Sequence, residues 1–217
     1  DGRRRLYLAK QFIIARVTTM SWLEQRMEPS CHRIRAAKSL AVVRVIEAEA
    51  TRRYWSTFYS NAHVPELSRR DEHPLNQALD SCSRFLSGIL LRWCLFHKLS
   101  PAHGFMHEPT TYIALAYDLL EPYRHWIERA CASAWAEQGE KRVVAYAVDV
   151  LKRYMDEVVF VPATRQHVRR KALLHGIVLA LRAFLLGDMQ RFIFPQEGPL
   201  KSGKPLRVSY QLIGAVK

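Results

Sequence analysis

The chain has 217 residues, of which 49% are hydrophobic, and its 33 lysines and arginines outnumber 20 acidic residues to give a formal charge of +13. This length and apolar content exclude a disordered chain and allow one sizeable core, or a medium domain with a small appendage. The positive charge favours a polyanionic partner, most often nucleic acid, although a ribosomal or membrane-surface partner stays open.

The cysteines and apolar runs indicate the compartment. The four cysteines are Cys31, Cys82, Cys94 and Cys131. They form no CxxC pair, which favours free thiols in a reducing cytosol over a disulfide framework. The basic start of the chain is not followed by a short apolar run with a cleavage site, so we expect no signal peptide. The longest apolar run, residues 172–187, is too short to span a bilayer and contains two charged or titratable residues, so we expect a buried helix there and no membrane partner.

Helical periodicity dominates the chain. We expect helices over residues 4–27, 34–60, 74–99, 112–136, 141–155 and from about 164 to 187. Pro74 suits the first turn of its helix, where a proline loses no hydrogen bond. Pro122 predicts a bend in the fourth helix, Thr164 is a candidate N-cap, and Gly187 ends the last helix.

Beyond Phe194 the helical period is lost and proline and glycine become frequent. The stretch PLRVSYQLI (205–213) predicts a short strand or a draped tail. We therefore predict an all-α fold, with a helical domain over residues 1–193. Residues 194–217 would form a C-terminal tail that is a candidate for partner binding.

The segment IEAEATRRYWSTF (46–58) contains two glutamates with different expected environments. One helical stripe comprises Glu47, Ala50, Thr51, Tyr54 and Phe58. Because this stripe is small and aromatic it should face the core, where the Glu47 carboxylate needs a cation or strong donors. A core arginine would serve equally well on the pattern alone. Glu49 lies on another face, solvated and able to pair with Arg53.

The segment GFMHEPTTYIALAYDLLEPYR (104–124) places Asp118 and Glu121 three residues apart on one helix face, with His107 upstream. Neighbouring carboxylates repel each other unless a cation or hydrogen bonds compensate. A solvated helix face is the plainer interpretation. With Glu47 added, the set of oxygen donors and one imidazole suits Mn²⁺ or Mg²⁺ better than a structural zinc.

Other patterns are weaker. A zinc site built from Cys94, His97, His103 and His107 would have only one cysteine and would straddle a helix end and a loop. GPLKSGKP (198–205) lacks the hydroxyl residue and the helix of a phosphate-binding loop, so we reject it. The basic pairs support a DNA surface without locating it. The candidate DNA-binding residues are Arg52, Arg53, Arg69 and Arg70.

Four segments, in this order, resemble the CRISPR-associated spacer integrase family, the catalytic subunit of the CRISPR adaptation complex. LAKQFIIARVTTMSWLEQR (8–26) resembles the opening helix of its catalytic domain, and IEAEATRRYW resembles its Glu-Gly-x-Ala-Ala-Arg-x-Tyr-Trp motif. HPLNQAL (73–79) resembles its Asp-Pro-x-Asn helix start, with Asn76 kept. The segment 104–124 resembles its Gly-Phe-x-His and Asp-Leu-x-Glu-Pro-Phe-Arg motifs. Together they cover most of residues 1–135.

The resemblance implies metal ligands at Glu47, His107 and Glu121, with catalytic roles for these and Asp118, and it places the motif arginine at Arg52. Asp118 would hydrogen-bond a metal-bound water or the far nitrogen of His107. The implied activity is Mg²⁺- or Mn²⁺-dependent DNA cleavage and spacer integration, in which a 3′-hydroxyl of a captured fragment attacks a phosphodiester of the CRISPR array.

The implied partners are captured DNA and repeat DNA, a small ferredoxin-like adaptation subunit and a second copy in a homodimer, in a prokaryotic cytoplasm. The family's N-terminal β-domain is absent from these residues, so we expect a truncated form, a naturally short form, or a domain of a fusion, for example with a reverse transcriptase. Ala48 and His73 replace a motif glycine and aspartate, and Ser83 stands where the family often has a tyrosine. A transposon-borne integrase relative and a non-catalytic helical DNA-binding scaffold remain as alternatives.

Overall fold

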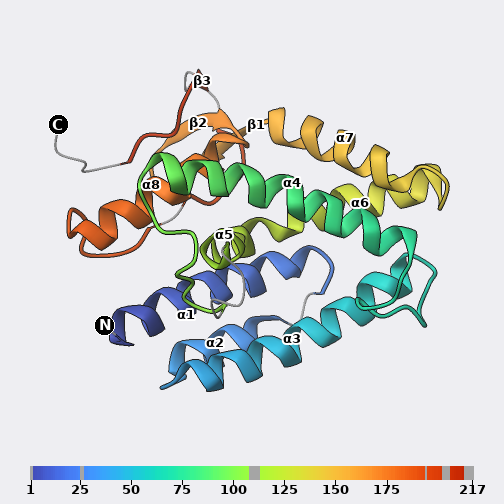
Figure 1. Ribbon diagram of the computed structural model, residues 1–217, viewed down its shortest axis with the longest axis horizontal. Coiled ribbons are helices and arrows are strands. Elements are labelled where there is room, and N and C mark those ends of the chain that lie inside the picture. The colour runs from blue at the N-terminus through green and yellow to red at the C-terminus, as the bar shows by residue number, and fades with distance from the viewer. Residues whose placement is uncertain (1, 25–26, 108–112, 194, 202–205, 213–217) are drawn as a thin grey trace.

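The computed structural model describes residues 2–24, 27–107, 113–193, 195–201 and 206–212, most of them in helices (Figure 1). In chain order the elements are α1 (Gly2–Thr19), the 3₁₀ turn η1 (Met20–Trp22), α2 (Glu28–Ala36), α3 (Leu40–Asn61), α4 (Pro74–Phe96), α5 (Ala114–Leu120), the 3₁₀ turn η3 (Glu121–Tyr123), α6 (Arg124–Gln138), α7 (Val143–Asp156), β1 (Val158–Val161), β2 (Gln166–Arg169), α8 (Ala172–Leu186) and β3 (Leu206–Arg207). The expected all-α class is confirmed, with one small sheet added.

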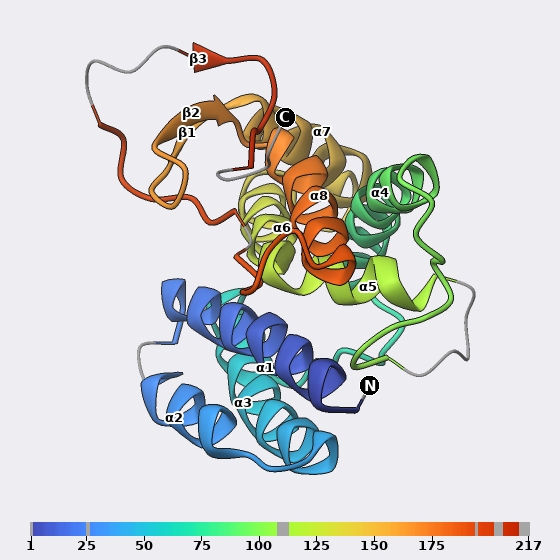
Figure 2. The same cartoon turned by 90° about the vertical axis from the view of Figure 1, so that its left-hand side faces the viewer.

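Helix α1 lies between two hydrophobic cores. Its Ala9 and Ile13 pack with α2 and α3 in the smaller core. Its Leu8 and Phe12 join the larger core, which α4 to α8 build. Figure 2 shows the same division, with α1 between the α2–α3 pair and the remaining helices. A helix with two buried faces positions both halves of the molecule relative to each other.

The first two predicted helices have different boundaries in the structure. Pro29 does not end a helix but lies in the first turn of α2, where a proline is tolerated. The predicted helix 34–60 is two helices, because Ala37 adopts an extended conformation (ψ 136°) and ends α2. Ser39 then caps α3 by accepting a hydrogen bond from the Val42 amide at 3.4 Å.

Helix α4 begins at Pro74, as predicted, and His73 is its N-cap. The His73 Nδ1 accepts a hydrogen bond from the Leu75 amide at 3.2 Å, a role an aspartate could also fill. Asn76 is buried and donates to the carbonyls of Ser68 and Asp71, each at 2.8 Å. The HPLN segment therefore fixes the start of α4 and the loop before it.

The predicted bend at Pro122 is present, since α5 and α6 are joined by the 3₁₀ turn η3. The prediction that Thr164 caps the last helix is wrong. Residues 158–169 form the antiparallel hairpin of β1 and β2, with Thr164 in its turn, and α8 begins only at Ala172. Gly187 ends α8 with a left-handed φ of +88°, as predicted.

Residues after α8 pack back on the helices. β3 pairs in parallel with β2, which confirms a short strand in the segment 205–213. Gly198 bridges to Phe160, and a Cβ on this glycine would lie 2.6 Å from Pro162 Cγ. Tyr210 is buried in the larger core. Across the described residues, no helix has both the length and the apolar character needed to cross a membrane.

Candidate metal-dependent active site

The loop 104–107 is attached to two helices, α1 and α3. Arg5 on α1 donates to the Phe105 carbonyl at 3.0 Å, and Arg44 on α3 donates to the Met106 carbonyl at 2.7 Å. Arg44 precedes Glu47 by three residues, so the two side chains lie on the same side of α3. The contact therefore brings the α3 face that bears Glu47 towards the His107 loop.

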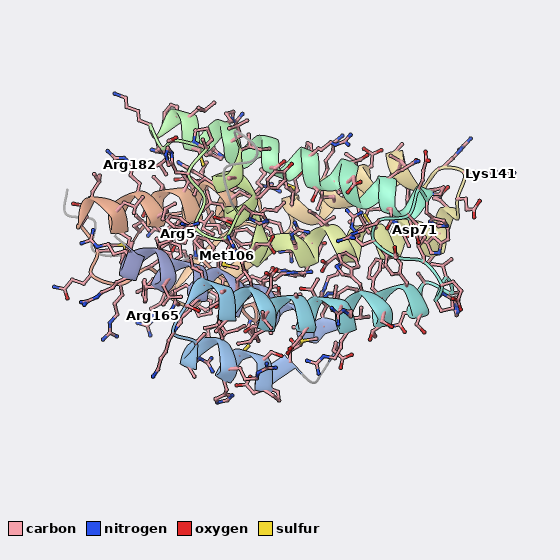
Figure 3. The ribbon with its side chains drawn as sticks, turned by 60° about the horizontal axis from the view of Figure 1, so that its bottom comes forward. Arg5, Asp71, Met106, Lys141, Arg165 and Arg182 are labelled. Carbon is pink, nitrogen blue, oxygen red and sulfur yellow. The ribbon has the colours of Figure 1, made fainter. Side chains whose placement is uncertain are left out.

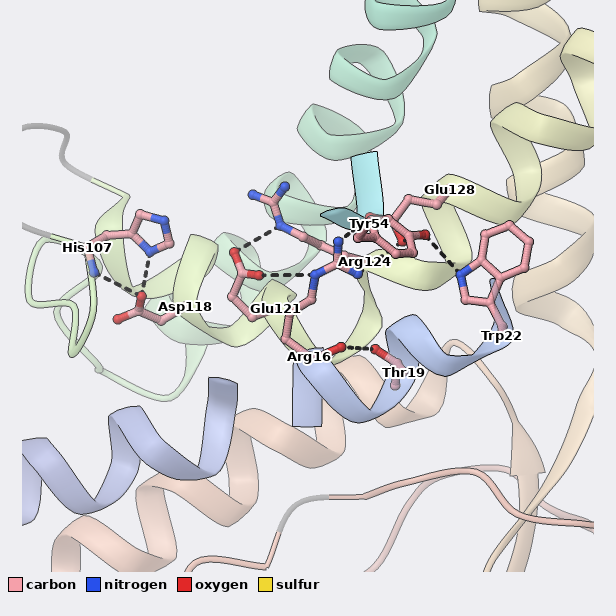
Figure 4. Close-up of polar contacts among 9 residues, drawn as sticks. All are labelled: Arg16, Thr19, Trp22, Tyr54, His107, Asp118, Glu121, Arg124 and Glu128. Carbon is pink, nitrogen blue, oxygen red and sulfur yellow. Dashed lines mark hydrogen bonds and ion pairs between the residues drawn. The ribbon is translucent and has the colours of Figure 1, made fainter. Parts of the chain in front are cut away.

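Asp118 organises this loop from α5 (Figure 4). Its fully buried carboxylate accepts hydrogen bonds from the backbone amides of Phe105, Met106 and His107, and from the His107 Nδ1 at 2.5 Å. The hydrogen bond expected between Asp118 and His107 is thus present. It raises the pKa of His107, against the opposing effect of burial. Because Nδ1 is engaged, Nε2 is the ring nitrogen left for another ligand.

Gly104 is required by the close approach of this carboxylate. A Cβ at position 104 would lie 2.7 Å from the His107 carbonyl oxygen and 2.8 Å from Asp118 Oδ2. Real Cβ atoms do not approach that closely, and the first of these neighbours is backbone. The glycine of the Gly-Phe-x-His motif is therefore part of how the loop presents His107.

Glu121 is buried in the turn η3 between two arginines. Arg124 donates to its Oε1 at 2.9 Å, and the Nε of Arg16 lies 3.8 Å from its Oε2. Arg16 also forms a bidentate pair with Glu128, at 3.0 and 2.5 Å. The Tyr54 hydroxyl donates to Glu128 at 2.6 Å and accepts from Trp22 at 3.0 Å.

This buried network determines the charge state of its members. Burial disfavours the charged form of Arg16, but Glu128 and Glu121 reverse this and raise its pKa. Burial likewise opposes ionisation of Glu128, and the Arg16 guanidinium brings the pKa of Glu128 below its usual value. Arg16 therefore stays charged and holds both acids of α6 and η3 in place.

Glu47 is half-buried on α3, and Ala50, Tyr54 and Phe58 of its predicted stripe are buried, which confirms the inward face. Burial raises the pKa of Glu47 to about 7, and the Glu121 charge adds to this, while His107, Arg124 and Arg16 act in the opposite direction. The Glu47 carboxylate therefore lies within electrostatic range of Glu121 and His107. The structure places it apart from Glu49, which is exposed and pairs with Arg33 of α2 at 2.7 Å instead of Arg53.

The donor set of Glu47, Glu121 and His107 suits a hard divalent cation in its chemistry, since it offers two carboxylates and one imidazole. The repulsion that raises the Glu47 pKa is what a cation between two carboxylates relieves. In the described part of the chain, however, no three histidine, cysteine or acidic side chains are close enough to hold a metal ion together. The Glu121 carboxylate is instead paired with Arg124 and Arg16.

The rejected zinc pattern is not assembled. Cys94 is buried, which raises the pKa of its thiol to about 12, and His97, His103 and His107 have separate partners. The candidate DNA-binding arginines have different environments. Arg52 and Arg70 are exposed, Arg53 donates to Ser30 at 3.3 Å, and Arg69 pairs with Asp80.

Arg16, Tyr54 and Glu128 were not among the predicted site residues. Arg16 interrupts the apolar stretch FIIARV, and Glu128 follows Glu121 by seven residues, which places both on one helix face. Both features of the sequence could have marked these residues as members of a buried polar network. The ion pair itself joins residues 112 positions apart, and no local pattern specifies such a partner.

The model of the family described as CRISPR associated protein Cas1 matches residues 1–142, about two thirds of the chain. The chain belongs to the Cas1 family. A search of curated proteins finds no match to this sequence.

Solved structures share the fold at low identity. A casposase bound to integration product has a TM-score of 0.73 and 20% identity, covering 88% of this chain and 64% of its own. A Cas1 protein from Thermotoga maritima has a TM-score of 0.74 and 15% identity, covering 86% of this chain and 67% of its own. A chain of a Cas6-RT-Cas1–Cas2 complex has a TM-score of 0.73 and 16% identity, and this chain covers only 25% of it, with 90% of this chain matched. The Cas1-family chain described here thus spans about two thirds of the first two structures and a quarter of the third.

Proposed function

We propose that this chain is the catalytic domain of a metal-dependent DNA endonuclease and integrase that inserts captured DNA fragments into a CRISPR array. The observation that carries the proposal is the hydrogen bond by which Asp118 fixes the His107 imidazole, in a loop that Arg44 ties to the α3 face bearing Glu47. Membership of the Cas1 family supports the class of activity. The charge of +13 supports a DNA substrate.

Glu47, His107 and Glu121 would hold Mg²⁺ or Mn²⁺. The ion would supply charge stabilisation at the phosphodiester that a 3′-hydroxyl or a water attacks. The remaining contributions come from the protein. Asp118 keeps the His107 proton on Nδ1 and leaves Nε2 to bind. Arg16 and Arg124 hold the Glu121 carboxylate in place, which reduces the cost of reorganisation at the site.

The substrates and partners follow from the same family membership. We infer captured fragments and repeat DNA as substrates, a small ferredoxin-like adaptation subunit as partner, and a homodimer as the working form. The likeness to a chain of a Cas6-RT-Cas1–Cas2 complex supports a further role as one domain of a fusion with reverse transcriptase. The C-terminal tail, residues 194–217, is the candidate for partner binding, and its residues 194, 202–205 and 213–217 lie outside the described residues.

A second candidate is a transposon-borne integrase. The fold match to a casposase bound to integration product, at a TM-score of 0.73, favours it. The two candidates differ in target DNA, since one inserts at repeats of a CRISPR array and the other joins transposon ends. Genomic neighbourhood, or the preferred target in a strand-transfer assay, separates them.

The test uses Glu47→Ala and Glu49→Ala in one assay of strand transfer and nicking, with labelled DNA and either Mn²⁺ or chelator. We expect Glu47→Ala to abolish both activities and Glu49→Ala to retain them, because Glu47 lies on the inward face of α3, whereas Glu49 is exposed and paired with Arg33. Wild-type activity that persists in chelator would refute metal dependence. Equal loss in two variants with native circular dichroism would refute the site, and inactivity of a folded wild type on every DNA would favour the scaffold.

A further inference from the structure

The C-terminal end of α4 and the adjoining turn of α8 form an exposed aromatic and basic surface, here termed the α4-end surface. Its residues are Arg92, Trp93, Phe96, His97, Lys98, His175 and Arg182. We propose that this surface binds single-stranded DNA, with a base stacked on Phe96 and phosphates on the surrounding arginines. The proposal rests on the proposed DNA function, because it identifies a second place where that substrate would be held.

Three rings of this surface are nearly parallel. Trp93 and His175 have centroids 3.8 Å apart at 17°, and His97 and His175 have centroids 5.0 Å apart at 20°. The Nε2 atoms of His97 and His175 are 2.8 Å apart, a hydrogen-bond distance. The rings are therefore fixed relative to one another before any ligand arrives, which lowers the entropic cost of stacking on them.

Phe96 is the ring offered to solvent. It lies edge-on to Trp93 and His97, at 88° and 83°, and is 70% exposed. Its exposure follows from the way α4 ends, because Lys98 adopts a left-handed φ of +59° and turns the chain away from the helix axis. An aromatic ring that stays this exposed while two neighbouring rings hold it has surface available for a nucleobase to stack on.

The charge of the α4-end surface matches a phosphate backbone. Arg92 lies over the Trp93 ring, 4.8 Å from its centroid. Arg182 lowers the pKa of His97, after the larger effect of burial, and Arg92 acts in the same direction on His175. Both arginines are exposed, and Figure 3 shows Arg182 at the periphery of the molecule.

A bound metal explains these features less well than a nucleic acid does. Two imidazoles 2.8 Å apart could approach a cation, but the charged groups that shift their pKa values are arginines, and the rings that stack on them are aromatic. Such an environment opposes a cation and attracts an anion. The combination of a basic rim with a stacking ring is typical of sites for single strands, since duplex bases are already stacked and paired.

The α4-end surface is connected to the candidate active site by one loop. The chain runs from Lys98 to the His107 loop, which Asp118 anchors. Leu115 of α5 also donates its amide to the Pro101 carbonyl at 2.8 Å within this connection. A strand held at Phe96 would therefore be bound at the start of the connection that leads to His107.

The test measures binding by fluorescence anisotropy in the presence of chelator, so that no catalysis is required. The probes are a short labelled oligothymidylate and a labelled duplex of equal length. Phe96→Ala should weaken oligothymidylate binding roughly tenfold or more and leave duplex binding unchanged. Leu95→Ala is the matched control, because Leu95 is the preceding residue, is 58% exposed and has no ring. Phe96→Trp should retain binding.

Arg182→Gln adds a second readout. Removal of one phosphate contact should reduce the salt dependence of oligothymidylate binding by roughly 0.7 in the slope of log K against log salt. Unchanged oligothymidylate affinity in Phe96→Ala, or equal losses for single strand and duplex, would overturn the proposal. A change of oligomeric state in Phe96→Ala without a change in single-strand affinity would assign the surface to contacts between copies. Failure of strand transfer in the wild type would count against the proposed function and leave this binding result standing.

Discussion

Glu197 ties the segment after α8 to the rest of the molecule, and its ionisation has a calculable effect on stability. Its carboxylate accepts from His125 at 3.1 Å, Trp126 at 3.0 Å and Arg170 at 2.7 Å, with 23% of the side chain exposed. Burial acts against the charge, but His125 and Arg170 prevail and lower the pKa of Glu197 from 4.5 to about 2. This difference corresponds to roughly 3 kcal/mol of folding free energy at about 1.4 kcal/mol per pKa unit.

The sign follows from the direction of the shift. Because the folded pKa lies below the unfolded one, the contribution is complete above about pH 4.5 and is lost as the pH falls towards 2. Glu197→Gln should therefore lower the free energy of unfolding by roughly 3 kcal/mol at neutral pH, and by only about 1 kcal/mol near pH 3. Urea denaturation followed by circular dichroism measures both. The matched control is Glu66→Gln at an exposed position, which should stay within about 0.5 kcal/mol of wild type. A Glu197→Gln deficit that is small at neutral pH, or constant from pH 7 to pH 3, would refute the reasoning.

Three further predictions concern the site and its substrate. Gly104→Ala should displace the His107 loop and reduce nicking by more than about tenfold while the helices remain folded, and wild-type activity would show that Asp118 tolerates the Cβ. Asp118→Asn should lose roughly 10- to 100-fold in activity and recover partly in excess Mn²⁺, whereas Glu121→Gln should not recover. Rescue of both variants would contradict the assignment of Glu121 as a metal ligand and of Asp118 as a residue that positions His107. Duplex DNA affinity should fall steeply with salt and depend little on sequence, and a titration with the same affinity at low and physiological salt would contradict this.

The inward face of α3 could be predicted from the sequence because its residues follow local periodicity. The stripe through Ala50, Tyr54 and Phe58 determined which glutamate of 46–58 faces inward, and the structure buries those three side chains. The three-residue spacing of Asp118 and Glu121 suggested a shared face. In the structure a helix end intervenes, and the two acids turn to different partners, His107 and Arg124.

The helix boundaries were harder to predict, for identifiable reasons. Pro29 is compatible with both the end of one helix and the first turn of the next, and only the extended Ala37 and the Ser39 cap separate α2 from α3. The hairpin carried a usable signal, since VVFV (158–161) is a β-branched and aromatic run bounded by Pro162. Its strands are short, and strong helical patterns precede and follow them, which obscured the hairpin.

The long-range ion pairs could not be predicted from the sequence. Nothing local in the sequence indicates that Arg16 pairs with Glu128 and approaches Glu121, because the partners lie on helices more than a hundred residues apart. The raised pKa of Glu47 depends on the same arrangement. Ligand types can thus be inferred from a pattern, whereas their charge states require the packed structure.

The most direct test of the proposed metal centre is anomalous diffraction from crystals soaked in Mn²⁺. The account predicts a single strong peak within bonding distance of Glu47, His107 Nε2 and Glu121, with Asp118 still hydrogen-bonded to His107 Nδ1. A peak coordinated directly by Asp118 with Glu121 turned to solvent would contradict the assignment of ligands. Absence of any peak near these residues, in crystals of a protein that cleaves DNA with Mn²⁺, would contradict the site itself.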